Sequence, residues 1–203
     1  MKRERKLNQA KNKAIAEAAV REFERAGYNS ANMDRVAKEA NVSKATVYKH
    51  FGSKKELFVS LMWEFKEIMD EHHTITYDPN KTIQSQLLEF GAKKLEFINN
   101  PQYMVMMKIG MIAMMQECEV TPLLKEMVTD HLFDNLIVWF KAAKSDNKLT
   151  LDDPVFVANQ FIGYIKSQLF FPPLLFGTPI PSRKEQESVV DNAIEAIVCQ
   201  YRG

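Results

Sequence analysis

The chain has 203 residues, of which 46% are hydrophobic and 26% charged, a composition that excludes disordered and collagen-like chains. The net charge is only +1, but residues 1–55 carry 14 Lys and Arg against 6 Asp and Glu, a net charge of +8, and the remainder carries −7. This asymmetry favours a polyanion-binding module joined to a different part, although a solvated basic face would give the same pattern.

Apolar residues at i, i+3 and i+4 spacing predict helices along the whole chain, and no segment reads as a strand. The first helix is expected over residues 8–26, with Gly27 as its terminator. The basic residues before it suggest either an arm for the minor groove or a disordered, solvated terminus; they are Lys2, Arg3, Arg5 and Lys6.

Two short helices follow, over residues 33–40 and 44–50. Asn32 and Ser43 are suitable N-caps for them, and Asn41-Val42 make a tight turn between them. Two helices of about two turns joined this tightly are typical of a helix-turn-helix.

Pro, Gly and capping residues bound the later helices. Ser53 with Glu56 and Ser182 with Glu185 have capping-box spacing, and Thr121 and Asp153 stand as caps before a Pro. The sequence therefore predicts an all-α chain of about nine helices, with an N-terminal three-helix helix-turn-helix domain over 1–55 and a second helical domain over 56–203. The later helices are expected over 53–73, 80–98, 102–117, 122–144, 154–171 and 183–201.

One continuous motif carries a family resemblance. It reads Val42-Ser43-x-Ala45-Thr46-x-Tyr48-x-x-Phe51-x-Ser53-Lys54-x-x-Leu57. With its flanks, over residues 10–62, it resembles the DNA-binding domain of the TetR family of transcriptional regulators. Two positions depart from that family's pattern. Ala31 replaces a common hydroxyl residue, which weakens any phosphate contact there, and Ala45 replaces a common Gly.

The third helix is the expected DNA reader. Its N-terminal N–H groups and positive dipole end suit a phosphate, Ala45 keeps its surface thin, and Thr46 is the best single candidate for a contact. The resemblance implies that Tyr48 and Lys54 clamp the DNA backbone. Tyr48 could instead be a half-buried surface aromatic and His50 a packing residue, whereas Val47 and Phe51 are expected in the core. The predicted DNA-binding residues are Asn32, Ser43, Lys44, Ala45, Thr46, Tyr48, Lys49, His50 and Lys54.

Specific operator recognition generally requires two such helices about 34–36 Å apart, so we expect a homodimer on palindromic double-stranded DNA. The last two long helices offer apolar stripes that could pair across a two-fold axis as a four-helix bundle, or could instead close the monomer core. The predicted interface residues are Ala158, Ile162, Ile165, Leu169, Val190, Ala193, Ile194 and Ile197.

Six methionines between residues 104 and 115 make a helix that is apolar nearly all round, which suggests an adaptable pocket for a small apolar effector. An ordinary Met-rich core is the alternative. The resemblance implies that such a ligand shifts the helix over 53–73 and changes the separation of the recognition helices. The candidate ligand-binding residues are Tyr103, Met107, Met111, Met114, His131, Trp139, Phe140, Phe161 and Tyr164.

Enzyme and metal motifs are not evident: the sequence has no GxSxG, P-loop, GxGxxG or HExxH pattern, and Cys118 and Cys199 lack zinc-ligand spacing. The adjacent pair His72-His73 is a weak metal candidate because the two side chains point to different helix faces. The longest apolar run, over residues 103–115, is shorter than the ~20 residues that cross a bilayer.

We therefore expect a cytoplasmic transcriptional regulator in which residues 56–203 form the helical regulatory and dimerisation domain. Members of this family are most often repressors. We expect no catalytic residues, metal or cofactor. A DNA-binding interaction protein of the same fold, which recruits a protein partner without a small ligand, is the alternative.

Overall fold

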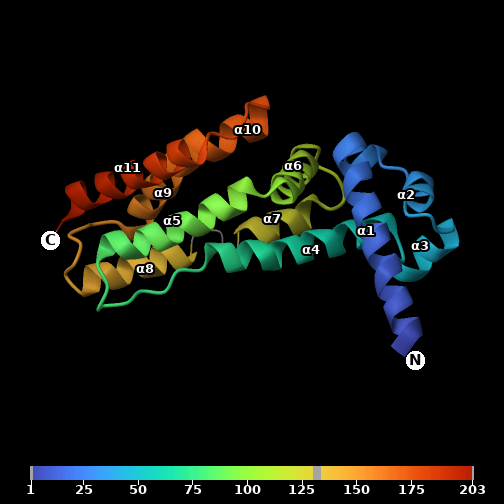
Figure 1. The fold of residues 1–203 in the computed structure, drawn as a ribbon, viewed down its shortest axis with the longest axis horizontal. Helices are drawn as coiled ribbons and strands as arrows, with labels where there is room; N and C mark the ends of the chain where they lie inside the picture. Colours follow the sequence, from blue (N-terminus) through green and yellow to red (C-terminus); the bar gives the residue numbers. More distant parts are fainter. Residues whose placement is uncertain (1, 130–133, 203) are drawn as a thin grey trace. The chain divides into compact units, whose positions relative to one another are not determined.

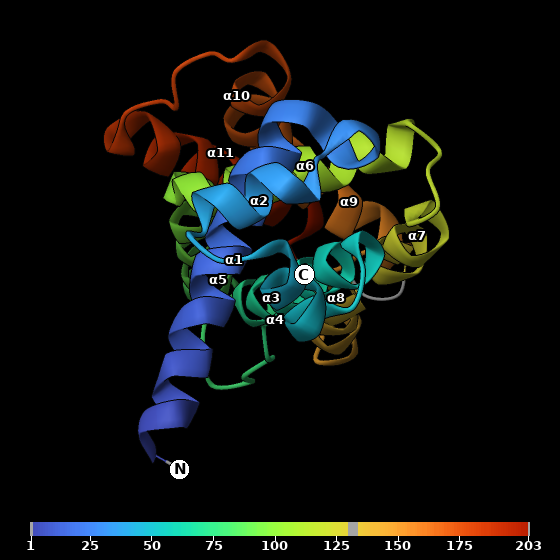
Figure 2. The same cartoon turned by 90° about the vertical axis from the view of Figure 1, so that its right-hand side faces the viewer.

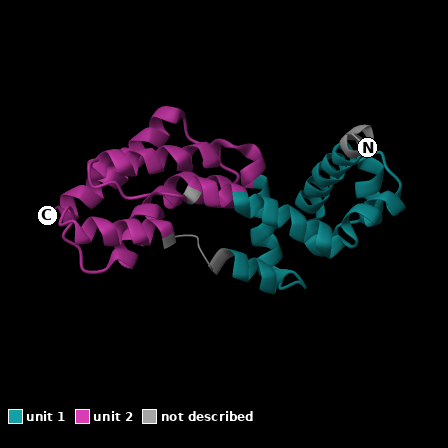
Figure 3. Cartoon of the chain, turned by 90° about the horizontal axis from the view of Figure 1, so that it is seen from below, with its two compact units in different colours: residues 1–67, 105–128 teal, residues 68–104, 129–203 magenta. Residues whose placement is uncertain are grey.

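Helices account for the regular structure of residues 2–129 and 134–202, the part of the chain that the computed structural model describes (Figure 1). Within those residues the single extended pairing is an isolated bridge between Leu149 and Arg202, so the expected all-α fold is confirmed. The chain divides into two compact units, residues 1–67 with 105–128 and residues 68–104 with 129–203 (Figure 3).

Helices α4 (Lys54–His73) and α6 (Pro101–Met115) cross from one unit to the other along the sequence, and the last residue of α7 (Thr121–Thr129) also belongs to the second unit. The first unit holds α1 (Lys2–Ser30), α2 (Met33–Glu39), α3 (Lys44–Phe51), the start of α4, the end of α6 and the rest of α7. The second unit holds the end of α4, the start of α6, α5 (Ile83–Asn99), α8 (Asp134–Ser145), α9 (Pro154–Ile165), the π-helical turn η1 (Lys166–Phe170), α10 (Phe171–Phe176) and α11 (Arg183–Tyr201).

Helix α1 begins earlier than expected, at Lys2, and its first turns project beyond α2 and α3 (Figures 1 and 2). The expected interruption at Gly27 is confirmed, since this residue has φ 70° and ψ 170°. Such a positive φ is readily adopted by glycine alone, and it allows the chain to turn before Tyr28. The inner face of α1 carries Ile15 and Phe23, both buried.

Three aromatic rings hold the break in α1 against α4. Phe23 and Phe58 meet edge to face at 5.0 Å between ring centroids, and Tyr28 packs on Phe58 in the same way at 4.9 Å. Edge-to-face pairs of this kind stabilise a core beyond their burial alone. The Tyr28 phenol also donates a hydrogen bond to the Glu119 carboxylate.

A buried carboxylate joins α1 to the start of α2. Glu22 is 2% exposed, accepts hydrogen bonds of 2.8–3.1 Å from the Arg25 guanidinium, and accepts another of 2.8 Å from the Asn32 N–H. Burial by itself would raise the pKa of this carboxyl, but the hydrogen bonds from Arg25 and Asn32 hold it below the usual value. The ionised form of Glu22 therefore stabilises the fold.

In the second unit, α5 and α9 both pack against α11 (Figure 1). The approach of α5 to α11 is so close that a Cβ added at Gly91 would stand 2.4 Å from Cγ1 of Val190. Asn99 and Gln186 exchange side-chain hydrogen bonds of 2.7 and 2.9 Å across the same pair of helices. A side chain at position 91 would therefore require Val190 to move.

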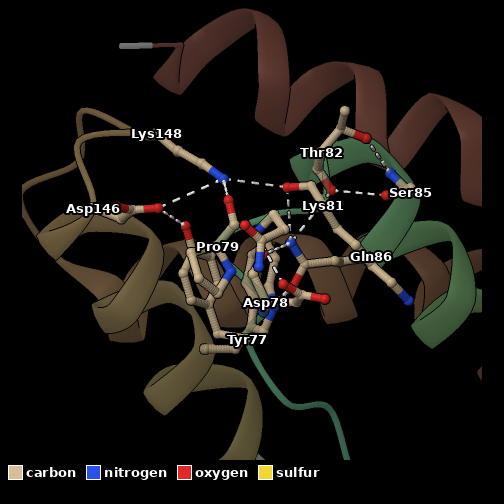
Figure 4. A network of polar contacts seen from close by, with 11 residues as sticks. Tyr77, Asp78, Pro79, Lys81, Thr82, Ser85, Gln86, Asp146 and Lys148 are labelled. Carbon is tan, nitrogen blue, oxygen red and sulfur yellow. Dashed lines mark hydrogen bonds and ion pairs between the residues drawn. The ribbon is translucent and has the colours of Figure 1, made fainter.

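The segment between α4 and α5 is fixed by a polar network (Figure 4). Gln86 donates to the Asp78 carbonyl at 2.9 Å and accepts from the Asp78 N–H at 2.8 Å and from the Trp139 indole at 3.0 Å. The Tyr77 phenol donates to Asp146 at 2.6 Å, and burial together with this carboxylate raises the pKa of Tyr77 to about 12. Residues 74–82 therefore form a fixed connection to α8, although they contain no helix.

The capping predictions agree with the structure at several helix ends. Asp153 caps α9 by accepting from the Val155 and Phe156 N–H groups, and Ser182 with Glu185 forms the full capping box of α11. Thr121 does not cap α7, because its hydroxyl donates to the Ala113 carbonyl at 3.0 Å. Where one helix was expected over 122–144, the structure has α7 and α8, and residues 130–133 lie outside the described part.

The helix expected to end before Pro172-Pro173 instead continues through η1 and α10 to Phe176. In η1 the Phe171 N–H donates to the Lys166 carbonyl, five residues back. This wider turn relieves the clash that a proline ring makes with the carbonyl four residues earlier in an α-helix. Gly177, with φ 64°, ends the run.

The predicted dimer-interface residues are buried within the single chain, so the alternative reading, closure of the monomer core, is the one the structure favours. A side chain already covered by its own chain has little surface left for a partner. All eight predicted residues are buried in this way: Ala158, Ile162, Ile165, Leu169, Val190, Ala193, Ile194 and Ile197.

Candidate nucleic-acid interface

The turn between α2 and α3 is a Schellman motif that closes α2. The Val42 N–H donates to the Ala37 carbonyl at 3.0 Å, and the Asn41 N–H donates to the Lys38 carbonyl at 3.1 Å. Asn41 has φ 53°, in the left-handed region that asparagine tolerates better than most residues. The sequence thus builds a sharp corner without glycine.

Helix α3 is capped at both ends. Ser43 accepts a hydrogen bond from the Thr46 N–H at 3.1 Å, as predicted, and its hydroxyl lies 2.8 Å from the Thr46 hydroxyl. At the other end Gly52 has φ 68°, and its N–H donates to the Tyr48 carbonyl at 2.8 Å. Two residues beyond the helix, Ser53 accepts from the Glu56 N–H at 3.0 Å and so opens α4.

One face of α3 packs inward and the other is open. Val47 is fully buried, as are Val36, Ala37 and Phe58, whereas Phe51 is half-buried. The open face carries Lys44, Ala45, Lys49 and Tyr48, whose side chain is 39% exposed. Thr46 and His50 are half-buried at its edge. The structure therefore brings four of the predicted DNA-binding residues, Lys44, Ala45, Tyr48 and Lys49, onto one short, exposed helical face.

Two predicted contact residues already have protein partners. The Lys44 ammonium lies 2.8 Å from the Asp34 carboxylate, and both side chains are exposed. Asn32 accepts from the Asp34 N–H at 2.8 Å as the N-cap of α2. Sequence reasoning missed the Lys44–Asp34 pair, because residues ten apart in sequence meet only once the turn at Asn41 is fixed.

Lys54 also differs from its expected environment. Its amine donates to the Tyr28 and Asn29 carbonyls, each at 3.0 Å, and lies 4.8 Å from the centre of the Tyr28 ring. These carbonyls belong to the end of α1, past the break at Gly27. Lys54 thus ties α1 to α4, and at most part of its hydrogen-bonding capacity is left for a phosphate.

The predicted ligand-binding residues fall in both units. Met107, Met111 and Met114 belong to the first; Tyr103, Trp139, Phe140, Phe161 and Tyr164 belong to the second; and His131 lies outside the described residues. Trp139, Phe140 and Phe161 are at most 1% exposed, and Tyr164 is exposed on α9. For the three buried aromatics, ordinary core packing is thus the simpler account.

Within residues 2–129 and 134–202, no group of His, Cys, Asp or Glu side chains is arranged to hold a metal ion. Over the same residues no helix is long and apolar enough to span a bilayer. The ring of His72 packs in an aromatic cluster, 5.9 Å from Phe97 and 5.7 Å from Tyr103 between ring centroids.

Comparison with known proteins identifies both parts of the chain. The model of the "Bacterial regulatory proteins, tetR family" matches residues 15–61, which hold the helix-turn-helix. The model of the "AefR-like transcriptional repressor, C-terminal domain" matches residues 85–203, more than half of the chain.

Individual relatives agree. A TetR family transcriptional regulator from Pseudomonas syringae pv. tomato is 29% identical, with a TM-score of 0.78 over 94% of this chain and 96% of its own. The flavonoid-responsive regulator FrrA, 21% identical over 95% of this chain and 97% of its own, shares the fold with a TM-score of 0.70. Among curated proteins, 63 residues are 46% identical to the HTH-type transcriptional regulator YhgD of Bacillus subtilis. A further match, of 66 residues, is 41% identical to the HTH-type transcriptional repressor SCO4008 of Streptomyces coelicolor.

These two curated matches cover 29% and 32% of this chain, and the chain spans 33% of the length of each relative. Both relatives are named as HTH-type regulators, while the two family matches carry the assignment of residues 15–61 and 85–203. The chain belongs to the TetR family of bacterial transcriptional regulators.

Proposed function

We propose that the protein is a transcriptional repressor that binds a palindromic operator as a homodimer and is released by a small apolar ligand. The observation that carries the proposal is the open face of α3, where Lys44, Ala45, Tyr48 and Lys49 stand together on a helix whose N-terminal cap is Ser43. A short exposed helix with basic and phenolic groups suits the major groove, and residues 1–55 supply a net charge of +8 for the phosphates.

Within this proposal the contacts have different roles. The Tyr48 phenol donates to a phosphate oxygen, whereas Lys49, and Lys44 once released from Asp34, reach base edges. Ser43, Thr46 and His50 complete the surface at its rim. In this proposal residues 1–55 form the DNA-binding domain, and residues 56–203 supply regulation and dimerisation.

The dimer in this proposal forms through the exposed face of α9, η1 and α10. Phe156, Tyr164 and Phe171 recur along this run at intervals of eight and seven residues, and all three are exposed. Gly163 lies on the same face. Apart from its chain neighbours and the backbone of its own helix, no atom of the described residues lies within 4 Å of the place where a Cβ would stand. A glycine in a helix costs about 1 kcal/mol relative to alanine, and a closely crossing helix of a second copy is a reason to keep it.

The effector acts by favouring one conformation of the repressor. A ligand shifts such an equilibrium only through its difference in affinity for the two states, which is typically worth about 1–3 kcal/mol. Helix α4 is the candidate transmitter, because it starts directly after the α3 cap at Gly52 and its last residues, from Ile68, belong to the second unit.

Selection of genomic DNA fragments, followed by titration of the selected duplex at two salt concentrations, tests the DNA-binding part. Tyr48→Phe removes only the phenol hydroxyl, so it should weaken binding to every sequence by about two- to tenfold, the value of one hydrogen bond. Lys49→Ala should change which operator variants are preferred. Lys141→Ala, an exposed lysine on α8, is the control and should leave affinity unchanged. If wild type shows no salt-sensitive affinity for any duplex, the proposal fails.

The dimer is tested by light scattering. Phe156→Glu should give monomers that bind operator weakly, whereas Leu88→Glu, which alters an exposed leucine on α5, should remain dimeric. If the wild-type protein is instead monomeric, and Phe156 is needed to capture a different protein, the result supports the alternative function, recruitment of a protein partner to DNA.

A further inference from the structure

Lys94 lies on the inward face of α5 and is only 5% exposed. Its amine donates a hydrogen bond of 3.0 Å to the His72 carbonyl, in the last turn of α4, and stands 4.5 Å from the centre of the Phe90 ring. In the described part of the chain no carboxylate pairs with this amine, and lysine is almost never this buried without a countercharge.

The neighbouring residue shows that capping α4 does not require a buried lysine. Lys93 donates to the Thr74 carbonyl at 3.1 Å, just beyond α4, with an exposed side chain. A hydrogen bond to a neutral carbonyl compensates only in part for removing an ammonium group from water. The contacts of Lys94 with the described residues therefore do not account for the burial of an ammonium group there.

A second lysine faces the same region. Lys166 is the first residue of η1, is half-buried, and has its amine 5.9 Å from the centre of the Phe170 ring. Burial, together with the charges of Lys166 and Lys93, lowers the pKa of Lys94 to about 6, and burial lowers the pKa of Lys166 also. π-helical turns are often found at functional sites. This one begins at Lys166, whose charge lowers the pKa of Lys94.

Aromatic rings lie near both amines. Phe90 lies 6.3 Å from Phe161 between ring centroids, and Phe170 contributes the third ring. Amines that can take up a proton beside aromatic rings match a small molecule that has an anionic end and a hydrocarbon body.

We propose that Lys94 and Lys166 together bind the carboxylate of the effector, so that the ligand is a small apolar carboxylic acid rather than a neutral hydrocarbon. This inference rests on the proposed ligand-regulated function and narrows its ligand class. The amine that would bind the carboxylate also holds the end of α4 through the His72 carbonyl, so ligand binding and the position of that helix end share one group.

Thermal-shift and calorimetric titrations of the full chain test the proposal with matched probes. Octanoate, benzoate and 4-phenylbutyrate are each compared with the primary amide of the same hydrocarbon, which lacks the charge. At least one carboxylate should bind about tenfold or more tightly than its amide, as expected for an ion-paired hydrogen bond. Lys94→Met should abolish that preference, and Lys93→Met, which changes the exposed neighbour, should keep it.

A second measurement needs no variant. At pH 8 the buried Lys94 amine is largely neutral, because its pKa is about 6, and a bound carboxylate stabilises the ammonium form. Binding should therefore take up about one proton, seen as a dependence of the calorimetric heat on the ionisation enthalpy of the buffer. The corresponding amide should take up none.

The outcomes separate this inference from the proposed function. Equal binding of every carboxylate and its amide, no binding of any probe, or a preference that survives Lys94→Met would overturn the inference. Operator affinity, measured on the same preparations, tests the DNA-binding function separately. If the protein still binds the operator in any of these cases, the ligand inference fails but the proposed DNA-binding function does not.

Discussion

Lys54→Met tests whether this lysine holds the fold together or is free to bind DNA. The substitution keeps the aliphatic stem but removes the amine that bonds the Tyr28 and Asn29 carbonyls at 3.0 Å and lies over the Tyr28 ring. A hydrogen bond to a charged group contributes about 1.5–3 kcal/mol when buried. Because Lys54 is half-buried, solvent screens these contacts, and we expect a total loss of about 1–2 kcal/mol.

For a chain of this size, 1 kcal/mol corresponds to about 2–4 °C in Tm, so Lys54→Met should unfold about 2–8 °C below wild type in a calorimetric scan. Lys55→Met, at the exposed neighbouring lysine, is the control and should change Tm by less than about 1 °C. Titration with operator at several salt concentrations completes the assay. If Tm is unchanged while the salt dependence of binding falls by about one counterion, the amine is a phosphate ligand and its role in joining α1 to α4 is refuted.

Three further predictions follow from the packing and the pKa values. Gly91→Ala should lower the free energy of unfolding, measured in urea, by about 1–2 kcal/mol, because its Cβ would lie 2.4 Å from Val190. Adding Val190→Ala should recover part of the loss. If the effects of the two substitutions simply add in the double variant, this contact is refuted. The pKa of the Glu22 carboxyl is held below 4.5, so its contribution to the free energy of unfolding is complete above that pH and is lost as the pH falls through the folded value. In Glu22→Gln the free energy of unfolding, measured in urea, should therefore depend less on pH in that acid range. The pKa of Tyr77 is raised from 10.0 to about 12, so its contribution to the stability of the fold is present below pH 10.0 and is lost as the pH rises toward about 12. In thermal scans, Tyr77→Phe should therefore remove the part of the fall in Tm at alkaline pH that comes from this phenol.

The helix-turn-helix was predictable because its determinants are local. Asn32 and Ser43 cap helices through their own side chains, and the left-handed corner at Asn41 needs only the residue type and two backbone bonds. Apolar spacing placed Val47 in the core for the same reason. Such features depend on neighbours within a few positions, which the sequence displays directly.

Features that depend on distant segments were not predictable. Helix α9 is apolar on more than one side, so periodicity did not reveal that Ile162 and Ile165 are covered by the chain itself while Phe156 is exposed. A pattern that assigns lysines to the surface gives no hint that Lys94 is buried or that the Lys54 amine binds the end of α1. Each of these outcomes follows from the way helices far apart in sequence pack together.

The π-helical turn has a consequence for comparing this chain with its relatives. A turn of this kind holds one residue more than the α-helix it interrupts, and each residue rotates an α-helix by about 100°. A homologue lacking one residue between 166 and 170 would present a different side of its α10 outward, with Phe171 and Leu175 turned from their present direction. Alignments that place a single-residue gap here would therefore mark relatives in which the side chains of this segment point in a different direction.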